Sequence, residues 1–223
     1  MSGINLVAIA TAFRELQRVF PDVNERLFDH RDPLDDDVIE NMLAGYGLVD
    51  RLVSAGVDIF AMGHLSHWLQ LNAVVLCGED DNAMERHHRL LEATEMRFYQ
   101  EPEGGIRDVM DWCAFNRSKD VWFRAAGIYN RILSQPQLFI EGNHRTGALI
   151  ISYLLLREGE PPFVLTARNA KGFFDPSSLM KKTKKRKLAE QFKFRRLTRT
   201  FAEFLEKHRN EDFLASARMH GSA

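Results

Sequence analysis

Apolar residues recur at intervals of three and four along much of the 223-residue chain, and this spacing restricts the fold more than any other feature. The first such stripe consists of Leu6, Ile9, Phe13, Leu16 and Phe20. These positions lie on one face of a helix, which Pro21 is predicted to end. Similar stripes cover 121–133 and 143–157, and Gly159 closes the second of them. The chain is therefore predicted to be all-α.

Two further helices are predicted from capping residues and periodicity. One begins at Asp35 or Asp36, either of which can serve as the N-cap. It is expected to end at Gly45 and Gly47, because glycine commonly follows the last turn of a helix. Residues 83–98 carry another amphipathic stripe and are expected to form a single helix.

Extended structure is predicted only at residues 97–107. Phe98 and Tyr99 favour a strand, and Pro102 with the pair Gly104–Gly105 favours a turn. This combination predicts a small β-hairpin, which we call the flap.

Charge is distributed unevenly, although the net charge is only −1. Residues 1–60 hold eleven acidic and five basic residues, whereas 181–200 hold ten basic residues and one acidic residue. The basic segment can pair with the acidic N-terminal third or can bind nucleic acid. Its interleaved aromatics, Phe192, Phe194 and Phe201, indicate a partly buried face. We therefore favour internal pairing and do not expect a nucleic-acid partner.

The location of the protein is predicted from what the sequence lacks. Cys77 and Cys113 are too few for a disulfide framework and are expected to be reduced thiols. No apolar run approaches the roughly 20 residues of a membrane span, and the first residues lack the basic region of a signal peptide. A soluble cytoplasmic protein with no membrane partner is expected.

The segment from Phe139 to Gly147, Phe-Ile-Glu-Gly-Asn-His-Arg-Thr-Gly, is a loop that enters a helix. Backbone N–H groups at the start of a helix lack partners within the helix and lie at its positive end, where a phosphate is a natural ligand. The arginine in the first turn adds a charged contact, and Glu141 offers an oxygen ligand for Mg²⁺. The predicted phosphate- or nucleotide-binding residues are Gly142, Asn143, His144 and Arg145.

These residues resemble the signature of the Fic (Fido) family, His-x-Phe-x-Asp/Glu-Gly-Asn-Gly/Lys-Arg-x-x-Arg. The matching positions are Phe139, Glu141, Gly142, Asn143 and Arg145. The resemblance implies a Fic-like helical bundle with a small β-hairpin flap. It further implies an N-terminal helical region over 1–90, a Fic-like core over 91–205 and a C-terminal tail over 206–223.

The resemblance also implies a function. Most members of the family transfer AMP from ATP to a protein hydroxyl. The motif histidine acts as the base, the acidic residue holds Mg²⁺, and the Gly-Asn turn with the first arginine holds phosphates. The last arginine grips the terminal phosphate. ATP or another nucleotide with Mg²⁺ is therefore the implied cofactor, and a target protein is implied to dock at the flap near 97–107.

Three departures from the signature modify this expectation. Gln137 occupies the histidine position, and an amide cannot accept a proton at neutral pH. General-base catalysis typically contributes about 10²–10⁴-fold in rate. Ala148 replaces the second arginine, and His144 occupies the Gly/Lys position. The sequence therefore predicts a nucleotide-binding protein whose AMP transfer is absent, weakened or replaced by altered chemistry.

Two alternatives remain open at this point. His144 is interpreted as a surface or supporting histidine, and the competing interpretation makes it a relocated base. The chain as a whole can also be a non-catalytic interaction protein. Its flap and basic segment would then engage a protein or nucleic acid, and its motif loop would be a relic.

Overall fold

The computed structural model describes residues 3–102, 104–185 and 188–215. It is mostly helical, and these residues contain two isolated β-bridges but no longer strand, which confirms the predicted all-α class. The α-helices are α1 (Leu6–Asn24), α2 (Asp36–Ser54), α3 (Ser66–Cys77), α4 (Asp81–Arg86), α5 (His88–Gln100), α6 (Ile106–Phe115), α7 (Val121–Leu133), α8 (Asn143–Arg157), α9 (Ala170–Lys181) and α10 (Leu188–Lys207). Two short 3₁₀ helices are η1 (Met62–His64) and η2 (Glu211–Phe213). In the part of the chain that is described, no helix combines the length and apolar character needed to cross a bilayer.

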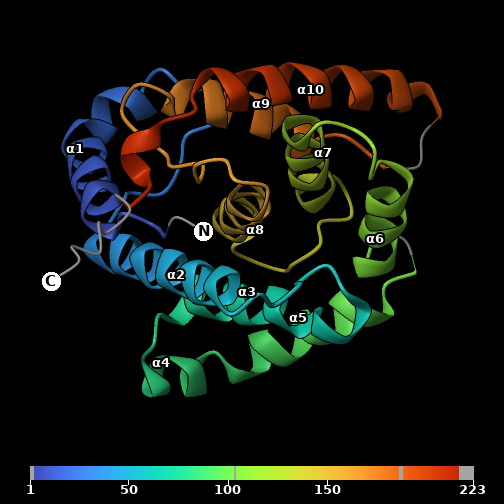
Figure 1. Ribbon diagram of the computed structural model, residues 1–223, viewed down its shortest axis with the longest axis horizontal. Helices are drawn as coiled ribbons and strands as arrows, with labels where there is room; N and C mark the ends of the chain where they lie inside the picture. The colour runs from blue at the N-terminus through green and yellow to red at the C-terminus, as the bar shows by residue number, and fades with distance from the viewer. Residues whose placement is uncertain (1–2, 103, 186–187, 216–223) are drawn as a thin grey trace, which may run out of the picture.

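Helix α8 forms the centre of the molecule and is seen almost end-on in Figure 1, with the other helices around it. All residues from Thr146 to Leu156 are buried, as expected for a helix enclosed on every side. Helices α2, α3 and α7 pack directly against it. One apolar cluster contains residues from both 1–90 and 91–205, so the central helix is shared by the two expected regions.

Gly45 and Gly47 lie inside α2, so the prediction that they end this helix is wrong. A Cβ atom added to Gly45 would lie 2.4 Å from Cδ1 of Leu149 on α8. Glycine here permits a close approach of two helices and does not terminate one. Pro21 also lies inside its helix, where Glu25 N–H donates to the carbonyl of Pro21 at 3.1 Å and α1 continues to Asn24.

The predicted flap is not seen in the described residues of 97–107, where α5 continues to Gln100 and α6 begins at Ile106. Phe98 is fully buried and stacks on Phe139, with ring centroids 5.8 Å apart. The ring of Phe98 therefore packs in the helical core and does not belong to a strand. Gly104 has φ +93° and turns the chain between the two helices. The described residues of this segment therefore offer no strand edge to a target protein.

The helix expected over 83–98 and the chain after α10 also differ from the prediction. The helix predicted over 83–98 is two helices, because His87 has φ −96° and ψ 4° and interrupts the run. Beyond α10, the chain returns to α1, and Leu214 forms an antiparallel bridge with Ile4. Residues 216–223 of the expected C-terminal tail lie outside the described residues.

Candidate functional site

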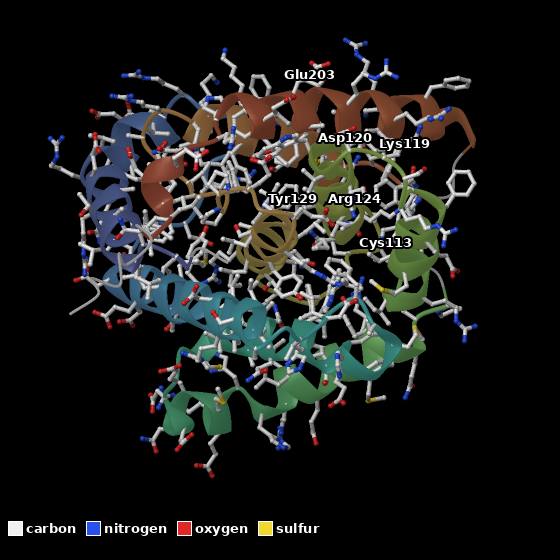
Figure 2. The ribbon with its side chains drawn as sticks, in the orientation of Figure 1. Cys113, Lys119, Asp120, Arg124, Tyr129 and Glu203 are labelled. Atoms are coloured by element: carbon white, nitrogen blue, oxygen red, sulfur yellow. The ribbon has the colours of Figure 1, made fainter. Side chains whose placement is uncertain are left out.

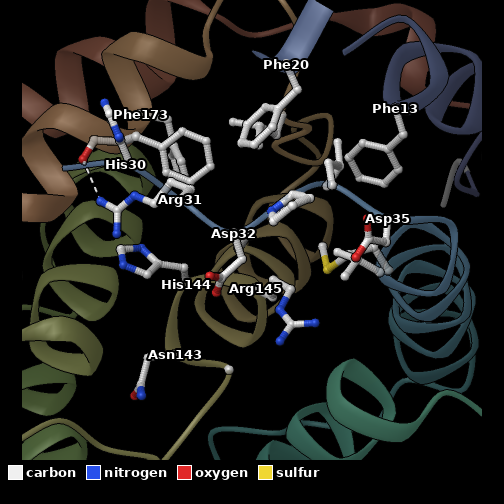
Figure 3. A pocket seen from close by; sticks show the side chains of 18 of the residues that line it. Phe13, Phe20, His30, Arg31, Asp32, Asp35, Asn143, His144, Arg145 and Phe173 are labelled. Carbon is white, nitrogen blue, oxygen red and sulfur yellow. Dashed lines mark hydrogen bonds between the residues drawn. The ribbon is translucent and has the colours of Figure 1, made fainter. Parts of the chain in front are cut away.

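The loop before α8 is held in shape by Asn143. Its Nδ2 donates to the carbonyl of Phe139 at 2.8 Å, and its Oδ1 accepts from the N–H of Phe139 at 3.0 Å. Both residues are buried. Figure 3 shows the amide of Asn143 directed away from the other labelled residues. The side chain is thus used within the loop, and the backbone N–H is what Asn143 can offer to a ligand.

Gly142 is the N-cap of α8 and has φ +75°, in the left-handed region that favours glycine. A Cβ atom there would lie 2.9 Å from Nδ2 of Asn72 on α3. That amide donates to the carbonyl of Glu141 and to Oγ1 of Thr146, both at 2.9 Å, and so fastens the chain on both sides of Gly142. Asn72 could not be predicted from the sequence, because it lies 69 residues before Glu141 and no local pattern marks it.

A cavity of about 470 Å³ opens at the start of α8 (Figure 3). Its charged and polar lining includes His30, Arg31, Asp32, Asp35, Asn143, His144, Arg145 and Lys181. Its apolar lining includes Phe13, Phe20, Tyr46 and Phe173. The volume falls in the range of small-molecule sites, roughly 300–1,000 Å³. No side chain of the N-cap bonds the N–H groups of the first turn of α8, so these groups can bind a ligand.

One wall of the cavity is the α1–α2 loop, residues 25–35. Arg31 Nη2 donates to Oγ of Ser178 on α9 at 2.6 Å. The N–H of Phe28 donates to Oδ1 of Asp175 at 3.0 Å, and Lys182 pairs with Asp29 at 3.0 Å. This loop comes from the expected N-terminal region, and sequence analysis assigned no role to Arg31.

Three cations line the cavity, namely Arg31, Arg145 and Lys181, and within the described residues none of them forms an ion pair. Burial lowers the pKa of Arg145, and the nearby Glu141 and Asp32 carboxylates partly oppose this shift. Arg145 Nη1 donates to the carbonyl of Val75 at 3.0 Å, which fixes the side chain between helices. The buried positive charge of Arg145 favours the binding of an anion, and the Asp32 and Asp35 carboxylates in the same lining offset part of it.

His144 is half-buried and lies in the wall of this cavity. Its Nδ1 lies 3.0 Å from the hydroxyl of Tyr129 on α7, which Figure 2 shows beside α8. Its Nε2 is enclosed and has no hydrogen-bond partner among the described residues. Burial, followed by the charges of Arg31, Lys181 and Arg145, lowers the pKa of His144 to about 3. The imidazole is therefore neutral at physiological pH.

The other motif positions differ in whether they line the cavity. Ala148 lines the cavity, whereas Gln137 and Glu141 are not part of its lining. Gln137 is half-buried, and its carbonyl accepts from Nε of Arg97 at 2.9 Å. The structure thus gathers Gly142–Arg145 and Ala148 at one cavity and leaves Gln137 and Glu141 outside it.

Magnesium has a single candidate ligand in the motif. The side chain of Glu141 is exposed and can contribute one carboxylate. In residues 3–102, 104–185 and 188–215, no group of three or more His, Cys, Asp or Glu side chains is placed to hold a metal ion. Mg²⁺ often uses one carboxylate together with phosphate oxygens and water. Glu141 therefore fits Mg²⁺ only when a bound phosphate supplies further ligands.

The basic segment is only partly paired. Lys182 contacts Asp29 of the acidic third, which confirms the predicted internal pairing for this residue. Lys185 is instead buried against the 97–107 turn, where its Nζ donates to the carbonyl of Gly104 at 3.0 Å and burial lowers its pKa to about 8. On α10, four exposed residues have no ion pair with described residues, namely Lys193, Arg195, Arg196 and Arg199.

The motif residues that can bind an anion thus meet the α1–α2 loop and the end of α9 at one cavity. Comparison with family models, with curated proteins and with solved structures finds no match to the chain.

Proposed function

We propose that this chain is a degenerate Fic-type protein that binds a nucleotide through its phosphates at the start of α8. One observation carries the proposal. The uncapped first turn of α8 opens on a cavity lined by Arg31, Arg145 and Lys181, none of which forms an ion pair with a described residue. Helix N-termini and unpaired cations both favour a phosphate.

The size and lining of the cavity suit ATP or another nucleotide. Phosphates would contact the N–H groups of the first turn and the cations, and a base would pack on the aromatic wall. Glu141 would hold Mg²⁺ through its carboxylate, and the bound ion would neutralise charge on the phosphates. The residues of the chain would then bind and orient the nucleotide.

The binding experiment is a calorimetric titration with ATP, ADP and CMP, with and without Mg²⁺. A bound nucleotide should also raise the melting temperature, since a ligand at 100 times its Kd stabilises by about 2.7 kcal/mol. Arg145→Ala should weaken binding. The matched control is Arg199→Ala, which removes an exposed arginine on α10. If millimolar ATP, ADP, CMP and phosphate all fail to bind, the proposal is wrong.

AMP transfer is proposed to be absent or severely weakened, because Gln137 supplies no base and lies outside the cavity lining. Labelled-AMP transfer to the protein itself and to lysate proteins should therefore give no signal. The double variant Gln137→His with Ala148→Arg restores the two motif residues, and labelling in this variant alone would support a degenerate transferase. Robust labelling by the unmodified chain would contradict the proposal.

A second candidate, a non-catalytic interaction protein, is favoured by the exposed basic face of α10. Lys193, Arg195, Arg196 and Arg199 accompany Phe192, which is 82% exposed. An acidic protein segment would complement this face, whereas our prediction remains that nucleic acid does not bind it. Mixed DNA and RNA should therefore bind weakly even at low salt. Tight binding that falls by about 10³–10⁵ between 50 and 200 mM salt would show a nucleic-acid surface.

A further inference from the structure

The charged side chains that line the cavity at the start of α8 nearly balance one another. Arg31, Arg145 and Lys181 supply three positive charges, and Asp32 and Asp35 supply two negative charges. None of the five forms an ion pair with a described residue. Leaving the histidines aside, the lining therefore has an excess of one positive charge. An excess of this size suits an anion of low charge.

The three cations of the lining lie around one position. After burial, their charges are what lowers the pKa of His144, so all three are within range of this single side chain. Among the residues of α8 that line the cavity, only Arg145 is charged, and Ala148 in the next turn adds no cation. Such a cluster can hold one phosphate group, whereas a chain of phosphates would extend beyond it.

Two carboxylates lie beside the phosphate-binding end of the cavity. Burial lowers the pKa of Arg145, and the charges of Glu141 and Asp32 oppose this shift, so both carboxylates lie near the guanidinium. Figure 3 shows Asp32 and Arg145 together at the start of α8. A second or third phosphate beside Arg145 would meet these like charges, and Mg²⁺ would be needed to offset them.

Asp35 belongs to a different part of the lining. In the view of Figure 3 it lies on the other side of Arg145 from His144. Its side chain does not cap α2, and no described residue donates a hydrogen bond to its carboxylate. A carboxylate can only accept hydrogen bonds, so it matches a ligand that carries hydroxyl groups. The aromatic lining, which includes Phe13 and Tyr46, suits a flat ring on the same ligand.

We propose that the ligand of this cavity is a nucleoside monophosphate, such as AMP, and not a nucleoside di- or triphosphate. The inference rests on the proposed function, because it names the nucleotide that the same site would take. The single phosphate would lie among Arg31, Arg145 and Lys181. The ribose hydroxyls would donate to Asp35, and the base would pack on the aromatic wall.

The direct test is a calorimetric titration with AMP, ADP and ATP at mildly alkaline pH, with and without Mg²⁺. Without Mg²⁺, AMP should bind at least about fivefold more tightly than ATP, with ADP between them, because each added phosphate brings negative charge that the lining does not offset. Mg²⁺ should narrow this difference without reversing it, since the ion neutralises the added phosphates but gives the lining no further cation. Tighter binding of ATP than of AMP in either condition would overturn the inference while the nucleotide site stands.

Asp32→Asn tests the role of charge. A Coulomb energy scales with the product of the two charges, so loss of this carboxylate should strengthen the binding of ATP more than that of AMP. The preference for AMP over ATP without Mg²⁺ should fall by about two- to fivefold. Asp111→Asn is the matched control, because it removes an exposed carboxylate on α6 outside the lining and should leave the preference unchanged. The same preference in both variants would overturn the inference.

The nucleoside part is tested at constant charge. AMP, ribose 5-phosphate and inorganic phosphate are all dianions at this pH, so differences among them report the base and the ribose. AMP should bind at least about tenfold more tightly than phosphate, and more tightly than ribose 5-phosphate, because of the aromatic wall and the acceptor. If AMP binds no more tightly than either of them, the base is not recognised and the inference fails.

Asp35→Ala removes the proposed acceptor of the ribose hydroxyls. Because AMP and phosphate carry the same charge, the preference for AMP over phosphate should fall at least about threefold through the lost hydrogen bond. The matched control is Asp37→Ala, which removes an exposed carboxylate from the first turn of α2 outside the lining. An unchanged preference in Asp35→Ala, or an equal fall in the control, would overturn the inference.

The outcomes separate this inference from the proposed function. If AMP, ADP, ATP and phosphate all fail to bind at millimolar concentration, the proposed function is wrong and the inference is lost with it. Adenosine that binds as tightly as AMP would show that the phosphate is not recognised, which also contradicts the proposed function. A preference for ATP overturns the inference alone.

Discussion

Asn72 on α3 should be the residue on which the shape of the motif loop depends most. Its Nδ2 donates to the carbonyl of Glu141 and to Oγ1 of Thr146, both at 2.9 Å. The informative change is Asn72→Leu, which keeps the number and branching of the side-chain heavy atoms and removes both hydrogen bonds. Since Thr146 is fully buried, its hydroxyl oxygen would lose this donor without access to water.

The magnitude follows from these two contacts. A hydrogen bond contributes about 0.5–1.5 kcal/mol net, and a buried polar group left without its partner costs about 1–3 kcal/mol. Glu141 is exposed, so water can replace the donor to its carbonyl. We therefore expect Asn72→Leu to lower the free energy of unfolding by about 2–4 kcal/mol. At about 2–4 °C per kcal/mol for a chain of this size, the melting temperature should fall by roughly 5–15 °C.

Urea denaturation of a double-mutant cycle with Thr146→Val measures the contact itself. Val removes the hydroxyl, so the double variant should lose about 1–2 kcal/mol less than the two single variants together. Anion binding should also weaken in Asn72→Leu, because Asn72 supports Gly142 at the start of α8. A single variant within about 0.5 kcal/mol of wild type, or an additive cycle, would refute the reasoning.

Three further changes test other parts of the structure. Asp32→Asn removes an exposed carboxylate from the cavity lining and should strengthen phosphate binding about two- to fivefold by calorimetry, whereas weaker binding would show that Asp32 assists the ligand. Gly127→Ala would place a Cβ atom 1.9 Å from Cη2 of Trp112 and should cost about 1–3 kcal/mol of unfolding free energy. The control Gly63→Ala meets no atom within 4 Å, so equal denaturation midpoints would contradict the packing account. The pKa of His144 lies near 3 in the folded state, below its ordinary 6.5, so the unfolded chain binds the proton more readily. The contribution of His144 to stability is present above about pH 6.5 and is lost as the pH falls toward 3, by about 1.4 kcal/mol per pH unit. Urea denaturation between pH 7 and 4.5 should show a shallower dependence in His144→Gln, and an identical slope would contradict the neutral, buried histidine.

The spacing of apolar residues was sufficient to predict those helices whose pattern does not depend on a distant partner. The predicted ranges 121–133 and 143–157 are the helices α7 and α8. The same reasoning failed where a residue serves a distant partner. Gly45 resembles a helix stop but accommodates Leu149 of α8, and Phe98 resembles a strand residue but stacks on Phe139. A one-dimensional pattern contains no information about what approaches from another helix.

The sequence by itself determined that the chain is helical and that the Phe139–Gly147 loop enters a helix, which begins at Asn143. The tertiary structure alone decided what surrounds that helix start. It brings Arg31 from the α1–α2 loop and Lys181 from α9 into one cavity, and leaves Gln137 outside the lining. It also places the hydroxyl of Tyr129 on α7 3.0 Å from Nδ1 of His144. These relations depend on contacts between residues far apart in the chain, because charge, burial and hydrogen bonding act through space and not along the sequence.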